Sequence, residues 1–110
     1  MKLELKQKGN YAILKIIGGL DAAHTKEFKQ QFQTYAEENI NFIFDLSQMD
    51  FMDSTGFGAI VSVYKLIKEV GGVILIANLQ SKPKMLFKIT RADKIFKVFD
   101  NLQAAEDYLK

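Results

Sequence analysis

The chain begins with two short segments in which polar and apolar residues alternate, a pattern typical of β-strands with one buried face. In the first, residues 2–6, Leu3 and Leu5 alternate with charged residues. The second, residues 11–17, is more apolar, and residues 8–10 between the two include a glycine and an asparagine, which favour turns. We therefore expect the first two strands to form a β-hairpin.

Four later segments have the 3.6-residue apolar spacing of an amphipathic α-helix. Their apolar positions are Phe28, Phe32, Tyr35 and Ala36 in the first, Phe57, Ile60, Val61, Tyr64 and Ile67 in the second, Met85, Leu86 and Ile89 in a short helix after Pro83, and Leu102, Ala105 and Leu109 in the last. We expect these side chains, those of the short third helix included, to face the core. Gly71 and Gly72 follow the second helix, where a left-handed cap forms easily.

Residues 42–46 and 73–77 are apolar almost throughout, as expected of central strands covered on both faces, and residues 95–99 predict one more strand. Because each later strand returns through a helix, it should run parallel to its predecessor. The sequence thus predicts one α/β domain over residues 1–110, with a mixed, mostly parallel sheet of about five strands and about four helices. The loops at residues 18–24, 47–55 and 78–82 should meet at the carboxyl edge of that sheet, the usual binding edge.

Composition narrows the classes of protein. The 110 residues are 48% hydrophobic and 25% charged, as in ordinary globular domains, and no apolar run is long enough to insert into a membrane. The absence of cysteine excludes disulfides, thiolate metal sites and a cysteine nucleophile. A reduced cytoplasm fits this composition, and the alternating N-terminus predicts a strand rather than a signal peptide. The net charge of +2 is too small to imply direct binding to nucleic acid.

The most informative segment is residues 49–58, which joins the most buried strand to the second helix. Phe51 and Met52 are expected to pin this loop to the body of the protein and leave Asp53 and Ser54 at the start of the helix. Aspartate and serine are good N-cap residues, because their oxygens accept hydrogen bonds from free first-turn amides. Capping is the simplest interpretation of both residues.

Two glycines in the first turns of that helix, Gly56 and Gly58, favour a more specific interpretation. Each costs about 0.5–1 kcal/mol relative to alanine, and two explanations account for the small size of these residues. One explanation is close packing of the helix against the sheet. The other is close approach of a protein or phosphate to the backbone, where the helix dipole favours an anion. The segment has no P-loop lysine and no dinucleotide fingerprint.

Residues 53–58, Asp-Ser-Thr-Gly-Phe-Gly, resemble the D-S-[ST]-G-[apolar]-G phosphorylation loop of anti-sigma factor antagonists, in the sulphate transporter and anti-sigma factor antagonist (STAS) family. As is usual in that family, an apolar pair precedes the loop. The resemblance extends to the order of elements over essentially the whole chain and to three further pairs, Leu20-Asp21, Tyr64-Lys65 and Gly71-Gly72. The chain departs from the family at Gly19, where an acidic residue is common.

The resemblance implies that Ser54 is phosphorylated by an anti-sigma factor with ATP-dependent serine kinase activity. Asp53 would orient the serine or its proton during transfer, Thr55 would support the site, and Asp21 would lie across the same edge and help to contact the kinase. Together with Gly56 these residues would form the partner-binding surface. The unphosphorylated protein would bind the anti-sigma factor and free a sigma factor, and a metal-dependent serine/threonine phosphatase would reset it. Neither catalytic activity nor a cofactor is implied.

Two other functions remain open. The chain could be a stand-alone STAS module in another signalling or lipid-transport complex, with Ser54 acting only as a cap. It could also bind a small nucleotide or anion at the same edge.

Other polar residues carry less information. His24, the only histidine, lacks partners for a metal site or a catalytic triad and is expected to face solvent near a helix start. Turn and cap roles explain Asp45, Asp50 and Asp53 without catalysis. Residues 82–97 contain six basic residues and one acidic residue, which we interpret chiefly as a solvated face and secondarily as a surface for an acidic partner.

Overall fold

The computed structural model describes all 110 residues, and the hairpin at the start of the chain is present as predicted. Strands β1 (Lys2–Lys8) and β2 (Tyr11–Ile17) pair antiparallel along their whole length. The turn between them contains Gly9 with a φ of 62°, a left-handed conformation that glycine adopts without steric cost.

The predicted mixed sheet is confirmed, with the order β1-β2-β4-β6-β7. The remaining strands are β4 (Asn41–Asp45), β6 (Val73–Ala77) and β7 (Lys97–Phe99), and each pairs in parallel with its neighbour. The last strand is shorter than predicted, because Arg91 adopts a left-handed conformation and residues 92–94 form a short 3-10 helix, η1 (Ala92–Lys94). Only the final three residues of the predicted strand therefore reach the sheet.

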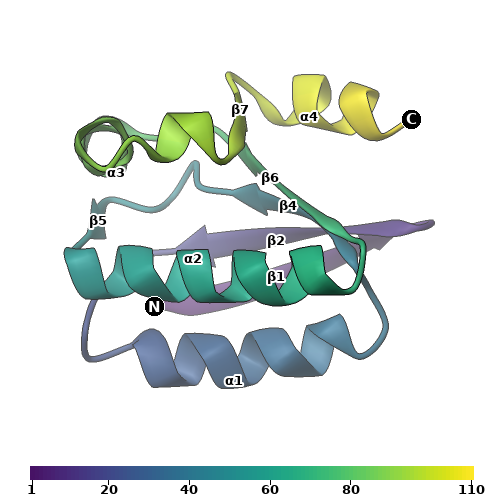
Figure 1. Ribbon diagram of the computed structural model, residues 1–110, viewed down its shortest axis with the longest axis horizontal. Helices are drawn as coiled ribbons and strands as arrows, with labels where there is room; N and C mark the ends of the chain where they lie inside the picture. The colour runs from purple at the N-terminus through teal and green to yellow at the C-terminus, as the bar shows by residue number, and fades with distance from the viewer.

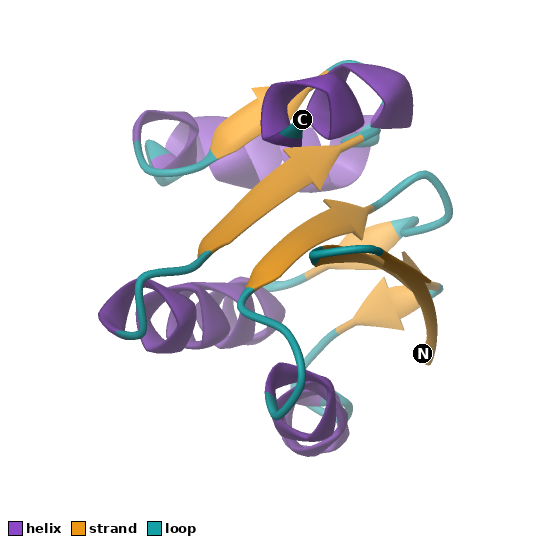
Figure 2. Cartoon of the chain, turned by 90° about the vertical axis from the view of Figure 1, so that its right-hand side faces the viewer, coloured by secondary structure: helices purple, strands orange, loops and turns teal.

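Helices cover both faces of this sheet (Figures 1 and 2). Helices α1 (Thr25–Ala36) and α2 (Ser54–Glu69) pack on one face, and α4 (Leu102–Leu109) packs on the other. Under α1 and α2, Phe28 and Phe32 of α1 meet Phe42 and Phe44 of β4, with ring centroids 4.8 to 6.3 Å apart. The phenylalanines predicted for the first helix and the central strand thus form one buried aromatic cluster.

The third helix, α3 (Ser81–Ile89), corrects one prediction. We expected Met85, Leu86 and Ile89 in the core, but Met85 is 63% exposed and Ile89 is 75% exposed. The helix begins before Pro83, which lies in the first turn, where a proline costs no hydrogen bond. Pro83 and Phe87, four residues apart, form the buried stripe, and Leu86 is only partly buried. Met85 and Ile89 therefore face solvent.

A second, two-stranded sheet was not predicted. Strands β3 (Gly19–Leu20) and β5 (Phe51–Met52) pair in parallel, with Gly19 opposite Phe51 and Leu20 opposite Met52. Figure 1 shows β5 and α3 at the end of the molecule where α2 begins. This small sheet brings the segment before Asp21 beside the segment before Asp53.

None of the four α-helices combines the length and the apolar character that a membrane crossing requires.

Candidate functional site

The carboxyl ends of the central strands meet at one edge, as predicted, and backbone hydrogen bonds join the loops there. The amide of Gly18 donates to the carbonyl of Gln48 at 2.9 Å, and the amide of Leu46 donates to the carbonyl of Ala77 at 2.9 Å. Loops after β2, β4 and β6 thus form one continuous surface.

A buried carboxylate fastens two of these loops. Asp45, at the end of β4, is 5% exposed and accepts hydrogen bonds from the amide of Ser47 at 3.0 Å and from Asn78 Nδ2 at 3.1 Å. Asn78 itself has a φ of 60°. The predicted turn role of Asp45 is confirmed, since its oxygen closes the turn after β4 and holds the loop after β6.

Asp53 is the N-cap residue of α2, as predicted. Its Oδ1 accepts a hydrogen bond from the amide of Gly56 at 2.8 Å, which satisfies one of the free first-turn amides. Ser54 is the first residue of the helix and is exposed, as is Thr55. The side-chain hydrogen bonds of this loop belong to Asp53, and Ser54 Oγ takes part in none of them. The Ser54 hydroxyl is therefore open to solvent at the positive end of the helix dipole.

Asp21 follows β3, which pairs with β5 just before Asp53, and a hydrogen bond between their neighbours Ala22 and Asp53 joins the two loops. The second oxygen of Asp53, Oδ2, accepts a hydrogen bond from the amide of Ala22 at 3.2 Å. The loop after β3 and the start of α2 are thus bonded through a single carboxylate.

The same loop contains a side-chain hydrogen bond that was not predicted. His24 Nδ1 lies 2.6 Å from Asp21 Oδ1, which also accepts a hydrogen bond from the amide of Ala23 at 3.1 Å. The hydrogen bond from His24 holds the pKa of the Asp21 carboxyl below its ordinary value. His24 is only half-buried and precedes α1 as its N-cap residue, so the expected position near a helix start is confirmed. The three-residue spacing of Asp21 and His24 was the available signal for the pair.

The two glycines of the loop have different surroundings. A Cβ atom on Gly56 would lie 1.9 Å from the carbonyl oxygen of Leu20, so close packing explains this glycine. A Cβ atom on Gly58 would meet nothing within 4 Å, and Gly58 is exposed. Packing inside the protein therefore does not account for Gly58.

The anchoring role predicted for the apolar pair Phe51 and Met52 is confirmed for Met52 only. Met52 is 6% exposed and anchors the loop, but Phe51 is 46% exposed. Successive side chains of a strand point to opposite faces, so only one of the pair can face the core once β5 forms. The exposed Phe51 ring stands two residues from Asp53, at the same edge as Ser54.

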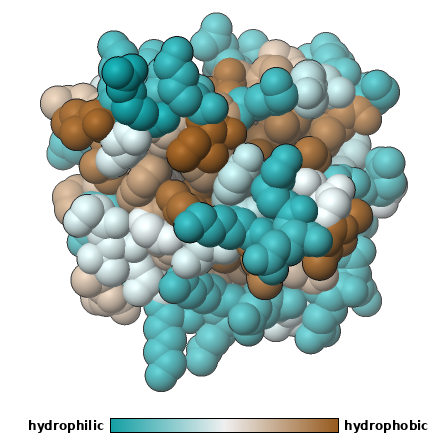
Figure 3. Space-filling view, in the orientation of Figure 1, coloured by the Kyte–Doolittle hydropathy of each residue, from teal (hydrophilic) through white to brown (hydrophobic).

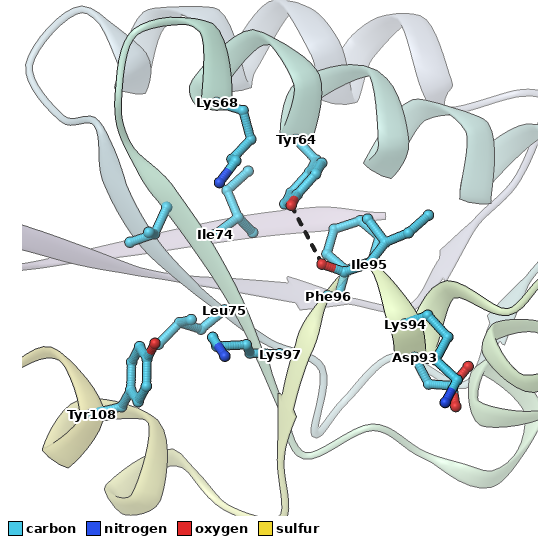
Figure 4. Close-up of a pocket in the computed structure, with 11 residues that line it drawn as sticks. Tyr64, Lys68, Ile74, Leu75, Asp93, Lys94, Ile95, Phe96, Lys97 and Tyr108 are labelled. Atoms are coloured by element: carbon cyan, nitrogen blue, oxygen red, sulfur yellow. Dashed lines mark hydrogen bonds between the residues drawn. The ribbon is translucent and has the colours of Figure 1, made fainter.

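Ser54 does not line any of the surface pockets. One of about 330 Å³ lies at the carboxyl edge, between residues 47–50 and 80–82. Another, of about 320 Å³, lies between α2, β6, β7 and α4, and Figure 4 shows Tyr64 and Lys68 on one side of it and Lys97 and Tyr108 on the other. Tyr64 and Lys68 stand in the third and fourth turns of α2, far along the helix from Ser54. No group of three or more histidine, aspartate or glutamate side chains could hold a metal ion.

Helix α3 presents a mixed surface next to this edge. It carries three lysines and no acidic residue, and Met85 and Ile89 are exposed among them. Figure 3 shows hydrophobic and hydrophilic side chains side by side over this part of the molecule. The basic face predicted for residues 82–97 is therefore solvated, and it also displays apolar side chains.

Comparison with known proteins gives consistent results. The family model for the STAS domain matches residues 2–105. The chain is 29% identical over 90 residues to the anti-sigma-B factor antagonist of Bacillus subtilis, covering 82% of this chain and 83% of that protein. It is 24% identical over 103 residues to the anti-sigma F factor antagonist of Paenibacillus polymyxa, covering 92% of this chain and 88% of that protein.

Solved structures agree on the fold. A crystal structure of the Thermotoga maritima protein TM1081 matches with a TM-score of 0.91 at 22% identity, over 96% of this chain and 92% of that one. The Bacillus protein SpoIIAA in its phosphorylated form matches with a TM-score of 0.76 at 16% identity, over 99% of this chain and 100% of that one.

Proposed function

This chain belongs to the STAS domain family, and from that premise we propose that it is an anti-sigma factor antagonist switched by phosphorylation of Ser54. In the unphosphorylated state it binds an anti-sigma factor and thereby releases a sigma factor. The anti-sigma factor is also the serine kinase that inactivates it, and a metal-dependent serine/threonine phosphatase restores the active form. The protein is itself no enzyme, needs no cofactor, and acts in the cytoplasm without binding nucleic acid directly.

One observation carries the proposal. The Ser54 hydroxyl is exposed at the first residue of α2 and is free of hydrogen bonds within the protein, while its neighbours Asp53 and Gly56 are held in place. A side chain that a kinase phosphorylates must be reachable, and an ordered backbone around it presents the hydroxyl in one orientation. The names of the relatives, antagonists of anti-sigma factors, support the choice of partner.

The switch follows from charge. A phosphoserine carries nearly two negative charges at pH 7, and at Ser54 these would stand beside Asp53 and four positions after Asp50 in the sequence. The amides at the start of α2 stabilise the phosphate within the free protein. A partner surface fitted to a neutral serine would instead meet new bulk and charge, and a loss of about 1.4 kcal/mol already weakens binding about tenfold. We therefore expect a change of surface rather than a refolding.

Intact-mass spectrometry tests the proposal. The purified protein is incubated with ATP and each anti-sigma serine kinase of the same organism. We expect one added phosphoryl group on the wild-type chain, none on Ser54→Ala, and one on the matched control Thr55→Ala, which removes the neighbouring exposed hydroxyl.

Two results would contradict the proposal. Addition of a phosphoryl group to Ser54→Ala would place the modification at another residue. No added mass with any of these kinases would favour a STAS module in another signalling or lipid-transport complex, with Ser54 only at a helix start, or a binder of small anions at the same edge.

A further inference from the structure

The two acidic residues of the site follow two strands that pair with each other. Leu20 ends β3 and lies opposite Met52, which ends β5, so Asp21 and Asp53 leave the small sheet side by side. Helix α2 then packs so closely on β3 that only a glycine fits at position 56, against the carbonyl of Leu20. The segments that present Asp21 and Ser54 are thus neighbours before any partner binds.

Beyond these strands, the Asp53 carboxylate is the side chain that joins the two segments. Its Oδ1 accepts from Gly56 within α2, and its Oδ2 accepts from Ala22 in the turn after Asp21. That turn is closed by the amide of His24, which donates to the carbonyl of Asp21 at 3.0 Å. Hydrogen bonds to a carboxylate are stronger than those to a neutral acceptor, and the helix dipole stabilises the negative charge of Asp53 at the start of α2.

We propose that Asp53 is a positioning residue, which holds the Asp21 turn against the start of α2 so that Asp21 and Ser54 form one docking surface. The inference rests on the proposed function of Ser54 as the switch residue, and it assigns Asp53 a different role from orienting the serine or its proton. Both Asp53 oxygens are already occupied by backbone amides. These two bonds fix the carboxylate between the turn after Asp21 and the first turn of α2, which is the geometry that a positioning role requires.

Two variants separate the positioning role from the others. Asp53→Ala removes both bonds. Ala22→Pro removes only the donor in the turn and leaves the Gly56 cap intact, and the position suits proline because Ala22 is the second residue of the turn that His24 closes. Asp50→Ala is the matched control, since Asp50 is an exposed carboxylate of the same loop.

Nuclear magnetic resonance tests the positioning role without any partner. In both Asp53→Ala and Ala22→Pro we expect the heteronuclear NOE of Ala23 and His24 to fall. We expect Gly56 amide exchange to accelerate about tenfold in Asp53→Ala alone, as for the loss of one hydrogen bond. Asp50→Ala should match the wild type. A turn that stays as ordered as in the wild type in both variants would overturn the proposal.

Kinetics with the kinase found in the mass-spectrometric experiment give the second readout. A positioning role predicts a KM for the protein substrate raised about tenfold in both variants, with kcat within about twofold of wild type. A lower kcat in Asp53→Ala together with wild-type kinetics in Ala22→Pro would show that Asp53 acts on Ser54 directly, and the positioning role would then be wrong. If no kinase modifies the wild-type chain, the proposed function fails, and the resonance experiment still decides the role of Asp53.

Discussion

Two glycines near the start of α2, Gly56 and Gly58, are separated by one residue and have opposite surroundings. At Gly56 a Cβ atom would lie 1.9 Å from the Leu20 carbonyl oxygen, whereas at Gly58 a Cβ atom would meet nothing within 4 Å. Neither residue has a positive φ, so backbone strain does not explain either glycine. The first is explained by packing inside the protein, and the second has no explanation inside the protein.

Alanine substitutions at these positions should act in opposite directions. We expect Gly56→Ala to lower the free energy of unfolding by about 1–3 kcal/mol, since backbone must move to admit the methyl group. We expect Gly58→Ala to raise it by about 0.5–1 kcal/mol, because alanine is the better helix former. Urea unfolding followed by circular dichroism measures both. Equal destabilisation by the two substitutions would be inconsistent with this packing.

Gly58 also tests the docking surface. If the anti-sigma factor approaches the backbone of α2 closely, Gly58→Ala should weaken its binding while stabilising the fold, an effect to be measured by isothermal titration calorimetry. Unchanged affinity would show that the partner does not contact Gly58.

At the scale of elements, α4 is held to the sheet by a buried polar contact as well as by apolar packing. The hydroxyl of Tyr11 on β2 donates to Glu106 Oε1 at 2.6 Å, and Lys8 Nζ lies 3.4 Å from the same oxygen. Tyr11 and Glu106 are each 8% exposed. The hydrogen bond with Glu106 and burial raise the pKa of Tyr11 to about 12, and the bond from Tyr11 holds the pKa of Glu106 below its ordinary value.

The sign of each pH effect follows from these shifts. The Glu106 contribution to stability is present above the ordinary glutamate pKa and is lost as the pH falls through the lowered folded value. The Tyr11 contribution is complete below its unperturbed pKa of 10.0 and is lost as the pH rises from there to about 12. The Tyr11–Glu106 hydrogen bond should therefore contribute less to stability at both acidic and alkaline pH.

The substitution Tyr11→Phe removes the hydroxyl that donates this hydrogen bond. We expect it to lower the free energy of unfolding at pH 7 by about 1.5–3 kcal/mol, the usual worth of a hydrogen bond to a charged group. The difference between wild type and variant should shrink between pH 10 and about 12, because the wild-type phenol ionises there. Urea unfolding at a series of pH values measures this difference. A difference in the free energy of unfolding that stays constant through that range would argue against a stabilising role for the Tyr11–Glu106 hydrogen bond.

At the scale of the whole molecule, positive charge is concentrated in one region. Residues 82–97 hold six of the 15 basic residues and one of the 13 acidic residues, so the small net charge conceals a basic face. This face includes α3, which lies beside β5 and the start of α2 (Figure 1). An acidic partner approaching Ser54 would therefore meet the lysines of α3 as well.

Charge reversal tests this secondary role. We expect Lys82→Glu combined with Lys84→Glu to slow association with the anti-sigma factor and to reduce its dependence on salt, as measured by stopped-flow kinetics. Lys26→Glu combined with Lys29→Glu, two exposed positions on α1, is the matched control and should have little effect. Unchanged binding by the Lys82 and Lys84 variant would exclude a role for the basic face.

Several features of the site follow from local patterns. The Asp53 cap and the exposed Ser54 were predicted because capping depends on residues close in sequence, and the central strands were predicted from their continuous apolar runs. The short β3 and β5 were missed because a two-residue strand has no periodicity of its own. The predicted buried face of α3 was wrong, because the pair Pro83 and Phe87 and the pair Met85 and Ile89 have the same four-residue spacing. The spacing alone could not show which pair is buried.

The amino-acid sequence alone therefore determined the order of the four α-helices and of the strands in the main sheet, the hairpin, and the loop in which Asp53 and Ser54 begin a helix. Each of these depends on residues close together in the chain. Only the tertiary structure decided which face of α3 is buried, that Leu20 leaves room for glycine alone at position 56, and that Asp53 accepts a hydrogen bond from Ala22. The contacts of Leu20 with Gly56 and of Ala22 with Asp53 join residues more than thirty positions apart in the chain. Local spacing carries no information about which distant backbone group will lie within reach.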